Sequence, residues 1–125
     1  MKPLINYDDF AKMDFRVGFV TKCERKEDAD KLLRLTVDFG EEEGTRTILS
    51  SLYPTYQPED LEGKQFIFVI NLEPRKFLGE LSHGMILCAD GSRPEPAEGE
   101  KPASPAGRPL PLIPQEKAEN GAAIT

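Results

Sequence analysis

The sequence is poor in the residues from which catalytic, metal and disulfide sites are usually built. It has one histidine and two cysteines in 125 residues. Cys23 and Cys88 lie far apart in apolar surroundings, which argues against a disulfide framework and against a clustered metal site. We expect two buried thiols in a reducing compartment.

A catalytic arrangement is also missing. His83 directly follows Ser82, and adjacent residues in a strand point to opposite sides, so the two do not form a base and nucleophile pair. Gly63-Lys64 resembles the end of a phosphate-binding loop, but Pro58 stands where that loop needs its first glycine. The sequence therefore predicts a protein that is not an enzyme and holds no metal.

Long apolar runs are absent. The first residues carry acids at Asp8 and Asp9, and no stretch is long enough for a signal peptide or a membrane span. We expect a soluble cytoplasmic protein with no membrane partner.

The chain has no excess of positive charge. Its formal net charge is −6 at pH 7. Proteins that hold nucleic acid by general electrostatic attraction are normally basic, so that class is excluded. Any nucleic-acid site here must be local.

The composition changes near Asp90. The last 35 residues hold 7 of the 11 prolines, and the stretch from Gly91 to Arg108 has no large apolar residue. We expect one domain in residues 1–90 and an extension in 91–125 whose first half is extended or disordered. The strip Pro109–Pro114 is more apolar, and it either lies against a hydrophobic patch or belongs to a flexible tail.

Within residues 1–90, apolar and polar residues mostly alternate, which is typical of half-buried strands. Leu33, Leu35, Val37 and Phe39 form one such inward-facing set. Gly18 suggests a bulge or bend in a long first strand that serves both sheets. The strands are expected at 15–24, 32–39, 45–50, 66–70 and 85–89, a helix at 7–12 capped by Asn6 or Asp8, and a helical turn starting at Pro58. This order predicts an all-β protein, a five-stranded OB-fold barrel with short helices and a proline-rich extension.

Two loops interrupt these strands, at residues 25–31 and 73–83. In an OB-fold the corresponding loops border the usual ligand surface. They carry five basic residues, Arg25, Lys26, Lys31, Arg75 and Lys76. They also carry five acidic residues, so the composition by itself favours a pair of solvated loops over an RNA site.

Five short runs point to one family. In sequence order they are Asp14-Phe15-Arg16-Val17-Gly18, Ala29-Asp30-Lys31-Leu32, Val37-Asp38-Phe39-Gly40, Asn71-Leu72-Glu73-Pro74-Arg75-Lys76 and Ser82-His83-Gly84-Met85. Together they resemble the tRNA-binding domain at the C-terminus of many bacterial methionyl-tRNA synthetases, which also occurs as free-standing tRNA-binding proteins and CsaA-type export chaperones. The resemblance covers residues 6–90.

The resemblance implies an OB-fold that has no cofactor. It further implies that the domain recognises the shape and the backbone of tRNA. It also implies a homodimer, with residues 91–125 as a candidate for part of the contact. The tRNA-binding residues that it indicates are Lys31, Arg34, Ser50, Asn71, Arg75, Lys76, Ser82 and Met85. Lysine and arginine would bind phosphates, and asparagine and serine would bind phosphates, base edges or the 2′-hydroxyl. Met85, with Phe77, would support a base.

Other roles stay open for some of these residues. Asn71 can simply shape its turn, and Met85 can belong to the core. Glu73 and Leu78 make the second loop less basic than is usual in the family. The acidic charge and the apolar strip from Leu110 to Ile113 favour an alternative function, polypeptide binding as a CsaA-like chaperone or docking to an aminoacyl-tRNA synthetase.

Overall fold

The computed structural model describes residues 1–91 and 108–125. The expectation of an extended or disordered segment falls mainly on residues 92–107, which lie outside the described residues. None of the helices in the described part has the length and apolar character needed to cross a bilayer.

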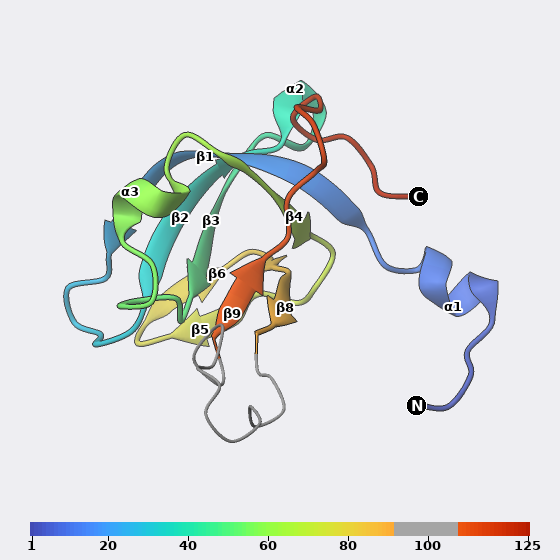
Figure 1. Cartoon of the computed structure of the whole chain (residues 1–125), viewed down its shortest axis with the longest axis horizontal. Helices are drawn as coiled ribbons and strands as arrows, with labels where there is room; N and C mark the ends of the chain where they lie inside the picture. The colour runs from blue at the N-terminus through green and yellow to red at the C-terminus, as the bar shows by residue number, and fades with distance from the viewer. Residues whose placement is uncertain (92–107) are drawn as a thin grey trace, which may run out of the picture.

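A long first strand, β1 (Phe15–Arg25), organises the barrel (Figure 1). Its first half pairs with β4 (Gln65–Val69) and its second half with β2 (Leu33–Asp38). With β3 (Thr45–Ser50) and β7 (Met85–Ile86), the antiparallel order is β3-β2-β1-β4-β7. The His83 backbone nitrogen donates to the Thr47 carbonyl at 3.0 Å, which brings the two edges together. The predicted five-stranded barrel of the OB-fold class is confirmed.

The core consists of the side chains that alternation places inward. Leu33, Leu35 and Val37 are fully buried on β2, and the intervening residues are only half-buried. The Phe39 and Phe68 rings meet edge to face with their centroids 5.3 Å apart. Burial of these side chains stabilises the barrel by about 1.5–3 kcal/mol for each large apolar residue.

The predicted helices are also present. In α1 (Tyr7–Ala11), the Asn6 side chain accepts a hydrogen bond from the Asp9 nitrogen at 2.8 Å, the usual N-cap contact. Helix α3 (Pro58–Leu61) begins with proline, and its first turn carries two acids. A further turn of helix, α2 (Gly40–Glu43), follows β2.

The predicted last strand, residues 85–89, is in fact two. β7 ends at Ile86, and β8 (Cys88–Asp90) pairs instead with β9 (Pro109–Pro111). Between them, the Leu87 nitrogen donates to the Ile67 carbonyl and the Leu87 carbonyl accepts from the Leu112 nitrogen. The strand divides because its hydrogen-bond partner changes from β4 to the C-terminal segment.

The described C-terminal segment, residues 108–125, lies on the barrel. The Val17 backbone exchanges hydrogen bonds with Gly121 and Ala122, and the Tyr56 hydroxyl donates to the Pro109 carbonyl at 2.7 Å. The proline-rich strip therefore packs against the folded part rather than forming a free tail.

The loop at 73–83 contains a hairpin made of β5 (Arg75–Phe77) and β6 (Glu80–Ser82). Its two turn residues, Leu78 and Gly79, both have positive φ, 48° and 84°, as in the turns that match strand twist. The hairpin packs against β3, where the Leu49 nitrogen donates to the Ser82 hydroxyl oxygen at 3.0 Å.

Of the two predictions for Gly18, a bulge or a bend, the bulge is not at this residue. The register of β1 against β2 shifts between Val20 and Lys22, so the irregularity is displaced from Gly18. A Cβ atom at Gly18 would lie only 2.5 Å from Val37 Cγ1 and 2.7 Å from the Phe39 ring. The absence of a side chain lets the core close over β1.

We therefore expect Gly18→Ala to destabilise the protein by about 1–3 kcal/mol through overpacking. Denaturant unfolding of both proteins would measure the change. An unaltered free energy of unfolding would contradict this view of the core.

Candidate nucleic-acid interface

A groove lies between the β5–β6 hairpin and the closing edges of the barrel. Its volume is about 410 Å³. Its lining includes Leu49, Leu72, Arg75, Phe77, Ser82 and Met85. The groove therefore combines an apolar floor with a charged wall, and three of the predicted binding residues, Arg75, Ser82 and Met85, meet in it.

Arg75 and Phe77 form one wall of the groove. They are two residues apart on β5 and so share a face of the hairpin. The guanidinium carbon of Arg75 lies 4.8 Å from the centre of the Phe77 ring, within the range of a cation–π contact. Met85 is 48% exposed, so it is a surface residue and not part of the core.

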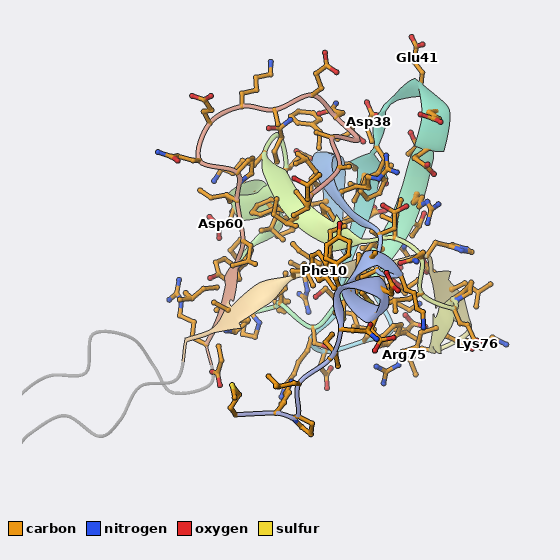
Figure 2. All side chains as sticks on the ribbon, turned by 90° about the vertical axis from the view of Figure 1, so that its right-hand side faces the viewer. Phe10, Asp38, Glu41, Asp60, Arg75 and Lys76 are labelled. Atoms are coloured by element: carbon orange, nitrogen blue, oxygen red, sulfur yellow. The ribbon has the colours of Figure 1, made fainter. Side chains whose placement is uncertain are left out.

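Lys76 points to the other face of the hairpin, opposite Leu81. Figure 2 shows Arg75 and Lys76 on one side of the molecule and Asp60 on the other. Both basic side chains belong to exposed residues. Among the ion pairs of the described residues, none involves either of them.

The first loop adds a second basic and aromatic contact. The Arg25 guanidinium lies 4.0 Å from the centre of the Tyr53 ring, and the Tyr53 nitrogen donates to the Lys31 carbonyl at 3.1 Å. Lys31 is exposed, and Ser50 is half-buried at the end of β3. Tyr53 was not predicted, because no sequence pattern connects it to Arg25 across 28 positions.

Arg34, also a predicted binding residue, is engaged by carboxylates. Its Nε and Nη2 donate to the two carboxylate oxygens of Glu80, each at 2.6 Å, and its Nη1 donates to Glu24 at 3.2 Å. These contacts raise the pKa of Arg34 and lower the pKa of Glu80 to about 2. Lys26, a buried lysine, pairs with Asp28 at 2.8 Å and with Glu80 at 3.4 Å.

Asn71 and Ser82 hold the backbone. The Asn71 amide accepts from the Asp14 nitrogen at 2.8 Å and donates to the Lys12 carbonyl at 2.6 Å, which fixes the root of the N-terminal arm. The Ser82 hydroxyl is buried, accepts from Leu49 and donates to the Gly84 carbonyl at 3.0 Å. Both side chains shape the rim of the groove.

The two cysteines of the described residues are thiols whose pKa is raised by burial. Cys23 and Cys88 are free thiols, and burial raises the pKa of Cys23 to about 11, so it stays protonated at neutral pH. Within residues 1–91 and 108–125, no group of histidine, cysteine and acidic side chains is arranged to hold a metal ion.

The pKa of Glu80 leads to a prediction about acid stability. Its ordinary value is 4.5 and its value in the folded protein is about 2, because the Arg34 hydrogen bonds favour the charged form. The stabilisation is complete above pH 4.5 and is lost as the pH falls toward 2. We expect the free-energy difference between wild type and Glu80→Gln, measured by denaturant unfolding, to shrink over this interval. A difference that stays constant would contradict the assignment.

Comparison with known proteins places this geometry in a family. The family model described as "Putative tRNA binding domain" matches residues 15–108. The methionine–tRNA ligase of Bacteroides fragilis is 50% identical over 88 residues, which is 70% of this chain and 13% of that protein. The ligase of Deinococcus radiodurans is 51% identical over 87 residues, 70% of this chain and 12% of that protein. The chain thus spans about an eighth of the length of these ligases.

Two solved structures are similar over nearly the whole chain. A MetRS related protein from Pyrococcus horikoshii has a TM-score of 0.80 and 35% identity, covering 99% of this chain and all of that one. The chaperone CsaA from Bacillus anthracis has a TM-score of 0.77 and 31% identity, covering 98% and 100%. The matched model, the shared sequence and the shared barrel agree, and the chain belongs to the family of tRNA-binding domains.

Proposed function

We propose that this protein binds tRNA without catalysing a reaction on it, and that the groove beside the β5–β6 hairpin is the contact surface. The observation that carries the proposal is the position of Arg75, an exposed cation that lines the groove beside Phe77 and Met85, with Lys76 exposed on the opposite face of the same strand. Neither cation has an ion pair among the described residues. Membership of the tRNA-binding domain family supports the choice of ligand.

Each side chain at the groove has a distinct task in this proposal. Arg75, Lys76 and, from the first loop, Lys31 neutralise phosphates of the tRNA backbone, and counterions are released. Phe77 and Met85 provide an apolar platform for an unstacked base, a contact worth about 1–3 kcal/mol when a full stack forms. Ser50, at the end of β3, is a candidate donor to a 2′-hydroxyl.

The other predicted residues take supporting tasks. The side chains of Asn71 and Ser82 already bind backbone groups, and the donors of Arg34 face carboxylates. We therefore place these three residues behind the contact surface.

A net acidic protein gains little affinity from long-range attraction, so local contacts must supply it. The −6 charge predicts weak, salt-sensitive binding that favours a folded tRNA body over a simple duplex. A filter-binding comparison of tRNA, duplex DNA and single-stranded RNA would show that preference.

Polypeptide binding is a second candidate function. Leu78 and Leu81 on the hairpin and Leu110 and Ile113 near the C-terminus are apolar and exposed. One structural relative is a chaperone by its description, and other relatives are methionine–tRNA ligases. An unfolded polypeptide or a synthetase surface is thus the alternative partner, and we place the protein in the cytoplasm in either case.

We further propose that two copies associate through the N-terminal arm, residues 1–13, with a contribution from the extension. Helix α1 has no buried residue, and Figure 1 shows it standing apart from the barrel. The arm nevertheless carries large exposed apolar side chains, among them Leu4, Ile5, Tyr7 and Phe10. Burial of these side chains against a second copy would remove their contact with water.

The first experiment changes Arg75 and Lys76 to alanine together. We expect affinity for tRNA to fall about tenfold and the slope of log affinity against log salt to flatten by about 1.4–1.8, because two phosphate contacts are lost. Filter binding over a salt series measures both quantities.

The matched control is Lys64→Ala with Lys117→Ala, which makes the same change in net charge. These two lysines line a different hollow, next to Ile113. Its effect on affinity should be much smaller. Equal effects of the two double variants, or preferred binding of unfolded polypeptide that tRNA does not displace, would contradict the proposed site.

The oligomeric state gives a separate prediction. Light scattering over a dilution series should report a mass of two chains for the wild type. Phe10→Glu should shift the mass toward one chain, because it places a charge in the apolar contact. A single-chain mass for the wild type at every concentration would rule the dimer out.

A further inference from the structure

Glu80 connects the β5–β6 hairpin, which forms one wall of the groove, to the first loop. It lies on β6 of the hairpin, and its carboxylate receives two hydrogen bonds from Arg34 on β2. It also pairs with Lys26, which begins the first loop. One carboxylate therefore ties the hairpin to both the barrel wall and the first loop.

Glu80, which makes this tie to Arg34 and Lys26, lies on the face of the hairpin that forms the groove. Glu80 is directly opposite Phe77 in the β5–β6 ladder, and Arg75 is on the same face two residues away. Fixing Glu80 therefore restrains the strand that carries Phe77 and Arg75, whose guanidinium packs on the Phe77 ring.

The geometry of this tie is stronger than that of an ordinary surface ion pair. Both Arg34 contacts are 2.6 Å long and occupy both carboxylate oxygens. The Arg34 and Glu80 side chains are only 27% and 28% exposed, and Lys26 is 6% exposed. A two-pronged, partly buried pair of this kind holds a fixed geometry that an exposed pair does not.

The hairpin has few other anchors near its tip. Ser82 holds the base of β6 to β3 through Leu49. At the tip, Leu78 is 62% exposed and Gly79 is also exposed, and Leu81 is exposed on the outer face. The contacts of Glu80 thus restrain the half of the hairpin that carries Phe77.

We propose that Glu80 is a positioning residue for nucleic-acid binding, which holds the β5–β6 hairpin against Arg34 and Lys26 so that Arg75 and Phe77 face the ligand. This inference rests on the proposed function. It also assigns Arg34 and Lys26 to the support of the groove, in place of direct phosphate contacts.

The change in affinity expected on removal of the Glu80 charge is opposite in sign to the change expected from electrostatics alone. Removal of a negative charge near a phosphate-binding surface should strengthen binding to a polyanion. Removal of the Glu80 charge should weaken it, because the gain in charge is smaller than the loss of an oriented hairpin. Glu73 offers a comparison, since it is an exposed carboxylate that lines the same groove and makes no ion pair among the described residues.

The experiment compares Glu80→Gln with Glu73→Gln, two isosteric changes that alter net charge equally. Affinity for tRNA is measured by filter binding over a salt series, and folding is checked by circular dichroism and thermal unfolding. We expect Glu80→Gln to bind about fivefold more weakly, which corresponds to about 1 kcal/mol, and Glu73→Gln to bind about twofold more tightly.

A third variant separates geometry from charge. Glu80→Asp keeps the negative charge but shortens the side chain by one methylene, so it cannot reach Arg34 and Lys26 in the same hairpin position. We expect weaker binding at unchanged net charge. This variant also serves where Glu80→Gln does not fold at the assay temperature.

A double-mutant cycle tests whether Arg34 acts through Glu80. We expect the effect of Arg34→Met to be much smaller in the Glu80→Gln background, because the tie is already broken. Additive effects would indicate a direct contact of Arg34 with the ligand and would overturn the proposal.

The remaining outcomes are equally distinct. Tighter binding by Glu80→Gln, as for Glu73→Gln, or unchanged binding by a folded Glu80→Asp, would overturn the role of Glu80 and leave the proposed function intact. Failure of the wild type to bind tRNA at any salt concentration would overturn the proposed function itself.

Discussion

The division of β1 between two partners is the constraint on which this structure depends. Residues 15–19 pair with β4 and residues 19–25 pair with β2, so one strand belongs to both halves of the barrel. The strand has to bend over the core, and the close approach of Val37 and Phe39 to Gly18 is the result. Because β1 ends at Arg25, the first loop emerges beside the hairpin that follows β4. The two connections meet at the Lys26–Glu80 ion pair, and the groove lies on the other side of the hairpin's attachment to the barrel edges, beside Leu49 and Met85.

Ion pairing, and not the composition of the loops, determines which basic side chains are exposed. The loops have as many acidic as basic residues, but the structure divides the basic residues into two groups. Lys26 is held by Asp28 and Glu80, whereas Arg75 and Lys76 remain exposed. An acidic domain can thus present exposed cations on this hairpin, because Asp28 and Glu80 pair with Lys26 and Arg34 and not with Arg75 or Lys76. The apolar Phe77 and Met85 beside that edge suit a ligand with both phosphates and bases.

Sequence reasoning predicted the strands well because their side chains alternate along the chain, as in Leu33, Leu35 and Val37. It also predicted the first helix, with Asn6 or Asp8 as its cap, and the start of a helical turn at Pro58, because these signals are local too. It did not predict the division of 85–89, because Leu87 changes partner to Leu112, a contact between distant segments. The site was predicted in part. Resemblance indicated Arg75 and Met85 at the groove, but no local pattern reveals that the donors of Arg34 are taken by Glu80, 46 positions away.

The two ends of the segment that the structure leaves undescribed are held side by side. The Gly91 nitrogen donates to the Arg108 carbonyl at 2.7 Å, and β8 pairs with β9 immediately beyond. The chain therefore leaves the barrel at Gly91 and returns to it at Arg108, beside the paired strands β8 and β9. The hydrogen bonds of this pair are made by residues outside the connection, so they do not depend on its length. Loop-closure entropy grows only slowly with length. This position is accordingly suited to shortening, or to insertion of an epitope or a fluorescent reporter, without disturbing the barrel.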